Sequence, residues 1–255
     1  MQVSRYGWVR DLPDHRDLLY SPPPQVAQAL PPSVDLRAGF QPCYDQGMLG
    51  SCTANAIAGA LQFLEEKEGE QAPVMPSRLF VYYNERSLEG TTSVDSGAQI
   101  RDGIKCVAKE GFCPETMWPY DTANFAERPS QGCYQYALKD RISQYLRLTP
   151  TLVPLLTCLA SGFPFVFGFT VYESFESNQV RQTGVVELPH PGEQVVGGHA
   201  VIACGFDGSQ RRFLVRNSWG EGWGMNGYFT MPYEYLIDPN LAADFWTIRQ
   251  VPIVG

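Results

Sequence analysis

A change in hydrophobic pattern near the middle of this 255-residue chain, from helical to strand-like, limits its fold more than any other feature. Small and apolar residues recur at helical spacing from Cys52 to Gly69. Shorter helices are predicted over residues 77–87, 100–109 and 151–160, and residues 113–134 are predicted to be a loop. Short β-rich segments follow, over residues 164–171, 199–206, 212–219 and 227–231. Helices followed by strands predict an α+β fold with two lobes.

Residues 1–31 form an N-terminal extension that differs from the rest of the chain. Repeated prolines exclude a continuous helix there. The charged run Asp11–Asp17 is typical of a solvated surface, but the extension also contains large apolar side chains, among them Tyr6, Trp8, Leu18, Leu19 and Tyr20. We therefore predict an extended strap that lies on the body of the protein.

The body, residues 32–255, is predicted to be one domain of two lobes. The helical lobe would cover residues from about 43 to 140, and the β-rich lobe residues from about 141 to 240. A cleft between two lobes is a common place for a ligand to bind.

The charge balance argues against two classes of partner. The 19 Lys and Arg residues against 27 Asp and Glu residues give a net charge of −8, so the chain has no electrostatic reason to bind nucleic acid or an anionic membrane. The longest nearly unbroken apolar run, Gly162 to Tyr172, is too short to span a bilayer. No secretory signal is recognisable. We expect a cytoplasmic monomer, with export by a signal-independent route left open.

The cysteines and histidines are not spaced like metal ligands. None of the seven cysteines is in a C-x-x-C pair, and there are only three histidines. We therefore predict neither a metal site nor a cofactor. Cys113 and Cys133 bracket a loop and could pair, so the disulfide state stays open.

Cys52 is the candidate nucleophile. It follows a glycine-containing stretch and opens the long predicted helix. The partial positive charge at a helix N-terminus favours the thiolate, which is the nucleophilic form of cysteine. The alternative is an inert buried thiol, which is common in protein cores.

Other residues can complete a site for acyl transfer. His199 starts a predicted strand after two glycines and is a candidate base. The amide oxygen of Asn217 can accept a hydrogen bond from the imidazole and fix its tautomer, and Trp219 is expected to cover that bond. The side chain of Gln46 and the backbone N–H of Cys52 can stabilise a developing oxyanion.

Three blocks of this sequence resemble the signature blocks of papain-like cysteine peptidases: Gln46–Cys52, Gly198–Val201 and Asn217–Gly220. They occur in the family's order. The spacing of 147 residues from Cys52 to His199 lies within the family's range of roughly 130–150, whereas the 165 residues from Cys52 to Asn217 slightly exceed it. Val34–Arg37 and Gly222–Tyr228 resemble the start of the family domain and its glycine-rich hairpin. The resemblance covers residues from about 31 to 250.

Two positions depart from the family pattern. Leu49 stands where the family usually has a cysteine, which implies that one of its usual disulfides is absent. Thr53 stands where the family usually has an aromatic residue. No segment resembles the family's long helical propeptide, because the strap is short and rich in proline. This combination is similar to the short bacterial branch of the family.

The resemblance implies hydrolysis of peptide or protein substrates through a thioester. Cys52 would attack the carbonyl as thiolate, and His199 would protonate the leaving amine. Asn217 would orient His199, and Gln46 would stabilise the oxyanion. By the same resemblance, a set of residues along the cleft would bind substrate: Gly50, Ser51, Gly97, Ala98, Gly198, Ala200 and Trp219. Residues 241–244 would supply a pocket floor, but Asp244 itself is expected to be a surface charge.

Several alternatives stay open at this point. An endopeptidase is favoured because the loop 122–140 has no histidine of the kind that makes some relatives exopeptidases. The other possibilities are a non-catalytic binding or regulatory protein on the same fold, and a Cys-His acyltransferase or isopeptidase. The strap either lies across the cleft as a short inhibitory segment or packs on the back of a lobe.

Overall fold

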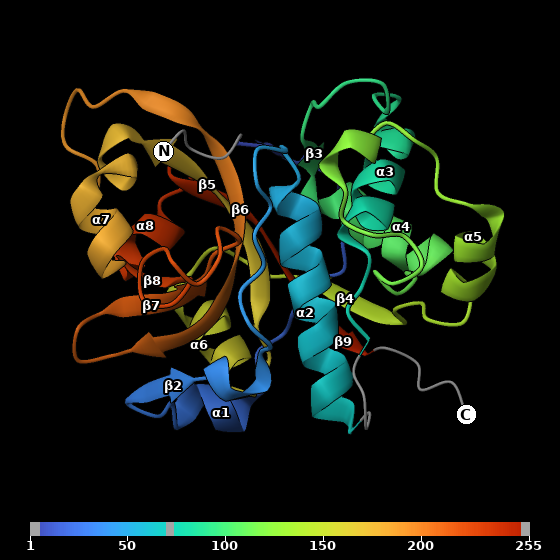
Figure 1. The fold of residues 1–255 in the computed structure, drawn as a ribbon. Helices are drawn as coiled ribbons and strands as arrows, with labels where there is room; N and C mark the ends of the chain where they lie inside the picture. The colour runs from blue at the N-terminus through green and yellow to red at the C-terminus, as the bar shows by residue number, and fades with distance from the viewer. Residues whose placement is uncertain (1–5, 70–73, 251–255) are drawn as a thin grey trace.

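The computed structural model describes residues 6–69 and 74–250. It has the predicted α+β architecture, with an antiparallel sheet on one side, a group of helices on the other and α2 (Cys52–Glu68) between them (Figure 1). The other helices are α1 (Pro24–Gln28), α3 (Arg78–Glu89), α4 (Ile100–Glu110), α5 (Gln131–Ala137), α6 (Leu152–Ala160), α7 (Asn178–Thr183) and α8 (Tyr233–Ile237). The strands are β1 (Trp8–Val9), β2 (Ser33–Asp35), β3 (Ala98–Gln99), β4 (Gln144–Arg147), β5 (Phe165–Tyr172), β6 (Val195–Asp207), β7 (Arg212–Arg216), β8 (Tyr228–Pro232) and β9 (Ala242–Gln250).

The central helix α2 is buried from Cys52 to Glu65. Small residues let it approach the sheet closely, since a Cβ added to Gly59 would lie 2.8 Å from Ile202 of β6. Gly69 ends the helix with a φ of 89°, a left-handed conformation that favours glycine. This packing brings the N-terminus of α2 beside β6.

The large sheet has seven strands, in the order β4-β9-β5-β6-β7-β8 with β2 paired to β6. Alternate residues of β5 point to opposite faces and enter two different cores. Phe165 and Phe167 belong to an aromatic-rich core on one face, while Val166 belongs to a core formed with α2, α3 and α4. The sheet therefore separates two hydrophobic cores, and the helical side carries α2.

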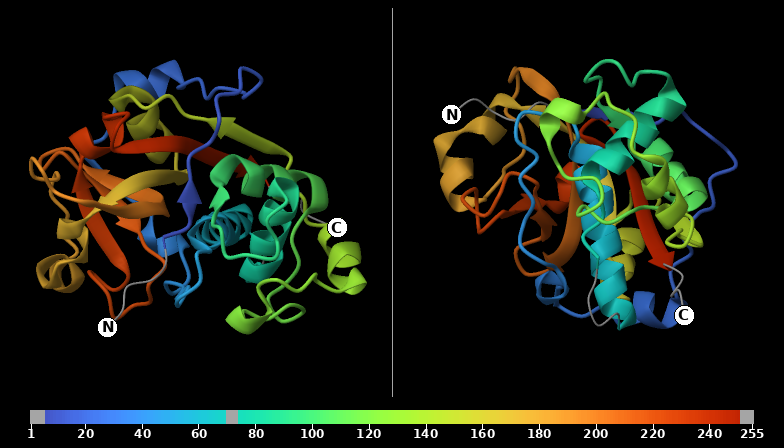
Figure 2. Two further views of the ribbon diagram at one scale, coloured as in Figure 1. Left: turned by 90° about the horizontal axis from the view of Figure 1, so that it is seen from above. Right: turned by 45° about the vertical axis from the view of Figure 1, so that its right-hand side comes forward.

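The strap passes between the two lobes (Figure 2). Its strand β1 pairs in parallel with β3 of the helical side, with Trp8 opposite Ala98. Farther along, the backbone N–H of Tyr20 donates to the carbonyl of Arg147 in β4 at 2.8 Å. The described part of the strap therefore touches both lobes.

The four predicted helices and four predicted strands are confirmed, with differences of a few residues at their ends. The prediction of a loop over residues 113–134 is wrong at its end, because α5 begins at Gln131. The helices α1, α5, α7 and α8 have five to seven residues each, too few turns to produce a recognisable helical period. The sheet also takes in β2 and β9, which lie outside the range 141–240 predicted for the β-rich lobe.

Two further observations concern the predicted environment and cysteine chemistry. Among the described residues, no helix is both long and apolar enough to cross a membrane. All seven cysteines lie in the described part of the chain and are free thiols, so Cys113 and Cys133 are not paired here.

Candidate active site

His199 and Asn217 form a buried hydrogen-bonded pair. His199 lies within β6 and not at its start, because the strand begins at Val195. Its Nε2 lies 2.8 Å from Asn217 Oδ1, which also accepts the backbone N–H of Ser218 at 2.8 Å. Because an amide oxygen can only accept, Nε2 carries the proton and Nδ1 is the basic nitrogen. Among the described residues, Nδ1 has no hydrogen-bond partner, so its lone pair is available.

Aromatic rings enclose this pair. The ring of Trp219 stacks on His199, with centroids 4.9 Å apart and planes at 28°. Phe169 of β5 meets the imidazole edge-on, with centroids 5.8 Å apart. An apolar enclosure keeps water away from the bond between His199 and Asn217 and so strengthens it.

Cys52 is completely buried at the N-terminus of α2, beside β6. Its thiol receives backbone hydrogen bonds from Ala200, the residue after His199, and from Gly7 of the strap. The helix thus brings the candidate nucleophile to the strand that carries the candidate base. The helix dipole places partial positive charge at this sulfur.

The loop before α2 holds Gln46 by contacts on both sides of its amide. Its Nε2 donates to the carbonyl of Leu49 at 2.9 Å, and its Oε1 accepts the hydroxyl of Ser218 at 2.6 Å. Its backbone N–H donates to the carbonyl of Ser218 at 2.9 Å. Since Ser218 follows Asn217, one segment fixes both the imidazole and the amide of Gln46.

Ser51 is also completely buried, but its side chain is committed elsewhere. The hydroxyl bonds to Tyr120, and it accepts the side-chain amide of Asn55 at 3.0 Å. The Ser51 hydroxyl therefore stabilises the start of α2.

Burial keeps both members of the candidate dyad neutral in this structure. It raises the pKa of the Cys52 thiol to about 12, against the backbone hydrogen bonds from Ala200 and Gly7, which lower it. Burial also lowers the pKa of His199 to about 4, against the hydrogen bond to Asn217, which raises it. Burial thus favours the protonated thiol and the uncharged imidazole in this structure, in which Gly7 of the strap lies at the Cys52 thiol.

Gly7 of the strap lies directly against the cleft residues. Its carbonyl accepts the backbone N–H of Ala98 at 2.8 Å. A Cβ added to Gly7 would lie 1.7 Å from the carbonyl oxygen of Gly50, and one added to Gly97 would lie 2.1 Å from the carbonyl oxygen of Gly7. Only glycine permits so close an approach of two backbones.

The side chain of Trp8 fills a recess in the sheet side of the cleft. A Cβ added to Gly168 would lie 2.0 Å from its ring, and one added to Gly198 would lie 2.8 Å from it. Its indole N–H donates to Asp244 Oδ2 at 3.1 Å. Asp244 is only 2% exposed, so the expectation of a surface charge is wrong; β9 carries this carboxylate into the recess.

Tyr6, which precedes Gly7 in the strap, contacts the aromatic enclosure of His199. Its ring lies 6.0 Å from that of His199 and 6.1 Å from that of Trp219, centroid to centroid. Its hydroxyl donates to Glu176 at 2.6 Å. Tyr6, Gly7 and Trp8 together touch residues on both sides of the cleft: Gly50, Gly97, Ala98, Gly198, His199 and Trp219.

The same arrangement of blocks is found in known proteins. The sequence profile described as "Papain family cysteine protease" matches residues 30–236. The chain belongs to the papain family of cysteine proteases. Peptides or proteins are the substrates of such an enzyme.

Three relatives illustrate how far this family likeness extends. Xylellain, a cysteine protease from Xylella fastidiosa, is 46% identical, with a TM-score of 0.92 over 98% of this chain and 97% of that one. An uncharacterized peptidase C1-like protein of Acanthamoeba polyphaga mimivirus is 43% identical over 99% of this chain and 90% of its own. Cathepsin J of Mus musculus is 27% identical, over 82% of this chain and 63% of its own. The predicted likeness to the short bacterial branch of the papain family is confirmed by xylellain.

Some residues of this papain-family cleft were not predicted from sequence. The run Asp11–Asp17 was expected at a solvated surface, yet Asp11 is 6% exposed. The aromatic residues of the strap were the available signal in the sequence, because a large apolar side chain such as Trp8 is expected to be buried against the body of the protein. Asp244 gave no such signal, since its burial depends on the pairing of β9 with β5. Within residues 6–69 and 74–250, no cluster of three His, Cys, Asp or Glu side chains is arranged to hold a metal ion.

Proposed function

We propose that this protease hydrolyses peptide bonds by a Cys-His-Asn mechanism. Cys52 attacks the substrate carbonyl as thiolate, while His199 receives the thiol proton at Nδ1 and returns it to the leaving amine. Asn217 holds the imidazole in the tautomer that leaves Nδ1 basic. Water then hydrolyses the thioester and releases the enzyme.

The hydrogen bond between His199 Nε2 and Asn217 Oδ1, stacked under Trp219, carries this proposal. It leaves the basic nitrogen unpartnered among the described residues, on the strand whose next residue contacts the Cys52 thiol. Gln46 is held beside this segment by Ser218, and its amide supports an oxyanion site with the Cys52 backbone N–H.

Two alternatives have less support. A non-catalytic binding protein would not need an imidazole held in a single tautomer within an aromatic enclosure. An acyltransferase or isopeptidase more often uses aspartate as the orienting residue, whereas the partner of His199 here is Asn217. The lack of a histidine in the loop 122–140 supports the proposal of cleavage within a chain, as by an endopeptidase.

Affinity labelling tests the proposed nucleophile. We expect an epoxysuccinyl peptide reagent to modify Cys52 selectively in the full-length chain carrying Trp8→Ala, which opens the cleft. The label should disappear when His199→Ala is added, because the thiolate loses its partner. Mass spectrometry locates the modified residue. Absence of labelling, or equal labelling of all seven cysteines, would show that Cys52 is not activated.

We further propose that the strap inhibits this protease by occupying its cleft. Gly7 lies between Gly50 and Ala98, and Trp8 fills the recess at Gly168 and Gly198. Burial under the strap disfavours both charged forms of the dyad, the Cys52 thiolate and the His199 imidazolium. The strap thus opposes substrate binding and the ionisation that catalysis requires.

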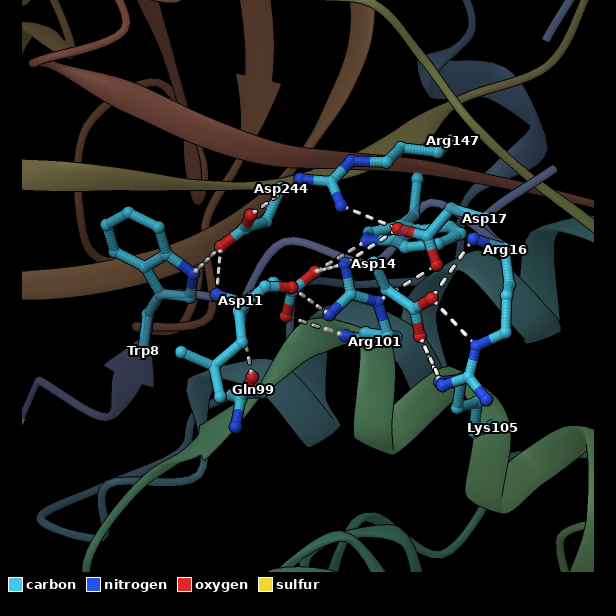
Figure 3. A network of polar contacts seen from close by, with 12 residues as sticks. Trp8, Asp11, Asp14, Arg16, Asp17, Gln99, Arg101, Lys105, Arg147 and Asp244 are labelled. Carbon is cyan, nitrogen blue, oxygen red and sulfur yellow. Dashed lines mark hydrogen bonds and ion pairs between the residues drawn. The ribbon is translucent and has the colours of Figure 1, made fainter. Parts of the chain in front are cut away.

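A buried ionic network fastens the strap to both lobes (Figure 3). Asp17 pairs with Arg101 of α4 and with Arg147 of β4, each at 2.6 Å. Arg147 also reaches Asp244 at 3.3 Å. These contacts join the strap to one helix and two strands, so strap release must break charged contacts on both lobes.

Asp11 is the central carboxylate of this network. It accepts the indole N–H of Trp246 at 2.9 Å and the backbone N–H of Arg101 at 3.1 Å. Its own backbone N–H donates to Asp244 Oδ2 at 2.8 Å. Burial raises the pKa of Asp11 to about 6, with a further increase from the neighbouring Asp244 carboxylate. The Arg101 guanidinium lowers that pKa in part.

The charged groups around the carboxylates of Asp11 and Asp244 come from several elements. Asp17 of the strap adds a third carboxylate to Asp11 and Asp244, and Arg101 and Arg147 supply two positive charges. Arg10 also lowers the pKa of Asp244, while burial raises it. Around the network, Lys105 pairs with Asp14 at 3.7 Å, and burial raises the pKa of Glu89 to about 6.

Strap docking should therefore weaken as the pH rises. A carboxyl whose pKa is raised in the docked state stabilises docking below its ordinary pKa, and this stabilisation is lost as the pH rises through about 6. Between pH 5 and pH 7.5, the Asp11 shift alone predicts roughly tenfold weaker docking. Asp11→Asn, which stays neutral, should remove this dependence.

The measurement is the rate of Cys52 alkylation in the full-length wild-type chain divided by the rate in Asp11→Asn. This ratio cancels the intrinsic effect of pH on the thiol and the titration of Glu89. It should rise roughly tenfold between pH 5 and pH 7.5. A flat ratio would contradict the role given to Asp11 but not strap inhibition itself.

A further inference from the structure

We infer that Tyr82 and Asp95 position the two backbone segments that hold a peptide on the helical side of the cleft. The inference rests on the proposed peptidase function. The two segments are the loop before α2, at Gly50, and the stretch that leads into β3, at Gly97 and Ala98.

A chain of hydrogen bonds connects the two segments. The Asp95 carboxylate accepts the backbone N–H of Gly50, at 3.0 Å to Oδ1 and 3.2 Å to Oδ2. The hydroxyl of Tyr82 donates to Asp95 Oδ1 and accepts the backbone N–H of Gly97 at 3.2 Å. The sequence of contacts is therefore Gly50, Asp95, Tyr82 and Gly97, and it crosses from one segment to the other.

Both connected segments contact the backbone of Gly7 in the strap. The carbonyl oxygen of Gly50 lies 1.7 Å from where a Cβ of Gly7 would be. Ala98, directly after Gly97, donates its backbone N–H to the Gly7 carbonyl at 2.8 Å. The distance between these segments thus decides whether a peptide backbone can meet both at once.

Tyr82 is itself held rigidly in α3. It is completely buried, and the Arg86 guanidinium lies over its ring at 3.9 Å. Arg86 donates to the carbonyls of Thr92 and Val94, at 2.8 and 3.0 Å. The loop that carries Asp95 is therefore fastened to the same helix that carries Tyr82.

Hydrogen bonds take the place of a covalent connection here. Leu49 stands where the family usually has a cysteine, and all seven cysteines are free. The loop before α2 is thus held by Asp95 without a disulfide. Gly50 also leaves room for this carboxylate, since a Cβ on it would lie 2.9 Å from Asp95 Oδ1.

The test compares two reagents that alkylate Cys52 in the full-length chain carrying Trp8→Ala. Iodoacetamide needs only a reactive thiol, whereas an epoxysuccinyl peptide must also bind along the cleft. Adding Tyr82→Phe should lower the rate with the peptide reagent roughly ten- to hundredfold, because both segments lose their common anchor. The rate with iodoacetamide should stay within about twofold, since the thiol is unchanged.

A matched control separates positioning from general stability. Tyr235 is also buried, and its hydroxyl donates to the carbonyl of Thr170 at 2.7 Å, on the sheet side. Tyr235→Phe removes one buried hydroxyl without touching the connected segments, so both rates should stay unchanged. Asp95→Ala should reproduce the effect of Tyr82→Phe, and Asp95→Asn, which keeps an acceptor oxygen, should restore part of the lost rate.

The remaining outcomes each decide the question. Unchanged rates with both reagents in Tyr82→Phe and Asp95→Ala would overturn the inference. A parallel fall with both reagents, together with a lower melting temperature, would do the same, because it indicates only a structural role. If Tyr82→Phe does not fold, the rates of Asp95→Asn and Asp95→Ala with the peptide reagent decide instead, and equal rates in these two variants would overturn the inference. A starting chain whose Cys52 fails to react with iodoacetamide would instead contradict the proposed nucleophile.

Discussion

Replacing Trp8 by alanine in the full-length chain should raise kcat/KM for a fluorogenic peptide by about a hundredfold. The indole packs against Gly168 and Gly198 and donates to Asp244. Removing a well-packed tryptophan costs about 3 kcal/mol or more. Each 1.4 kcal/mol is about a factor of ten in an equilibrium constant, so the docked form should lose about two powers of ten in its population relative to the open form.

Gly7→Val should have an effect at least as large, for a different physical reason. The Cβ of any residue other than glycine would lie 1.7 Å from the carbonyl oxygen of Gly50, so the backbone of the strap cannot return to its place. Valine adds two methyl groups at the same point. The change is steric and removes none of the charged groups, since Asp11 and Asp17 keep their carboxylates.

Leu12→Ala is the matched control for both strap variants. Leu12 belongs to the same segment but is 72% exposed, so its side chain contributes little to docking, and turnover should stay at the wild-type value. If Trp8→Ala and Gly7→Val both leave turnover unchanged as well, the strap does not limit activity, whatever its position in the cleft. Active-site titration with the epoxysuccinyl reagent would then measure how much of the wild-type chain is open.

The parts of the fold that could be predicted are those fixed by local pattern. The helix from Cys52 shows a regular period and a terminal glycine, so its start, its end and its nucleophile candidate follow directly. Residues of the strand at His199 alternate between two cores, which makes the strand recognisable without its partners. Short helices such as α5 leave no such period.

The parts that could not be predicted depend on contacts between distant residues. The burial of Asp244 arises because β9 pairs with β5 and the strap covers it, through Trp8 and the backbone of Asp11. The place of the strap depends on glycines that are far apart in the chain. Gly97 leaves room for the backbone of Gly7, and Gly168 leaves room for the ring of Trp8. Neither arrangement can be read from spacing or composition.

His199→Ala in the Trp8→Ala chain should lower kcat/KM by about ten-thousandfold or more, as expected for loss of the base in such a catalytic set. The reason is that burial raises the pKa of the Cys52 thiol, so the thiol needs a base to take its proton. The imidazole is the group proposed to take the thiol proton and then deliver it to the leaving amine, so its loss removes both transfers. His190→Ala is the control, because His190 lies in an exposed loop and should leave turnover unchanged.

Asn217→Ala should give a smaller loss, about ten- to a hundredfold, because the base remains and one hydrogen bond to the imidazolium, worth about 1.5–3 kcal/mol, is removed. In the wild-type chain Asn217 Oδ1 holds the proton on Nε2; without it, Nδ1 can carry the proton and lose its basicity toward the thiol. The loss should appear in kcat, since Asn217 is 3% exposed and lies beneath the imidazole that a substrate would meet. A fall in Asn217→Ala as large as in His199→Ala would contradict an orienting role and would indicate that the imidazole has left its position.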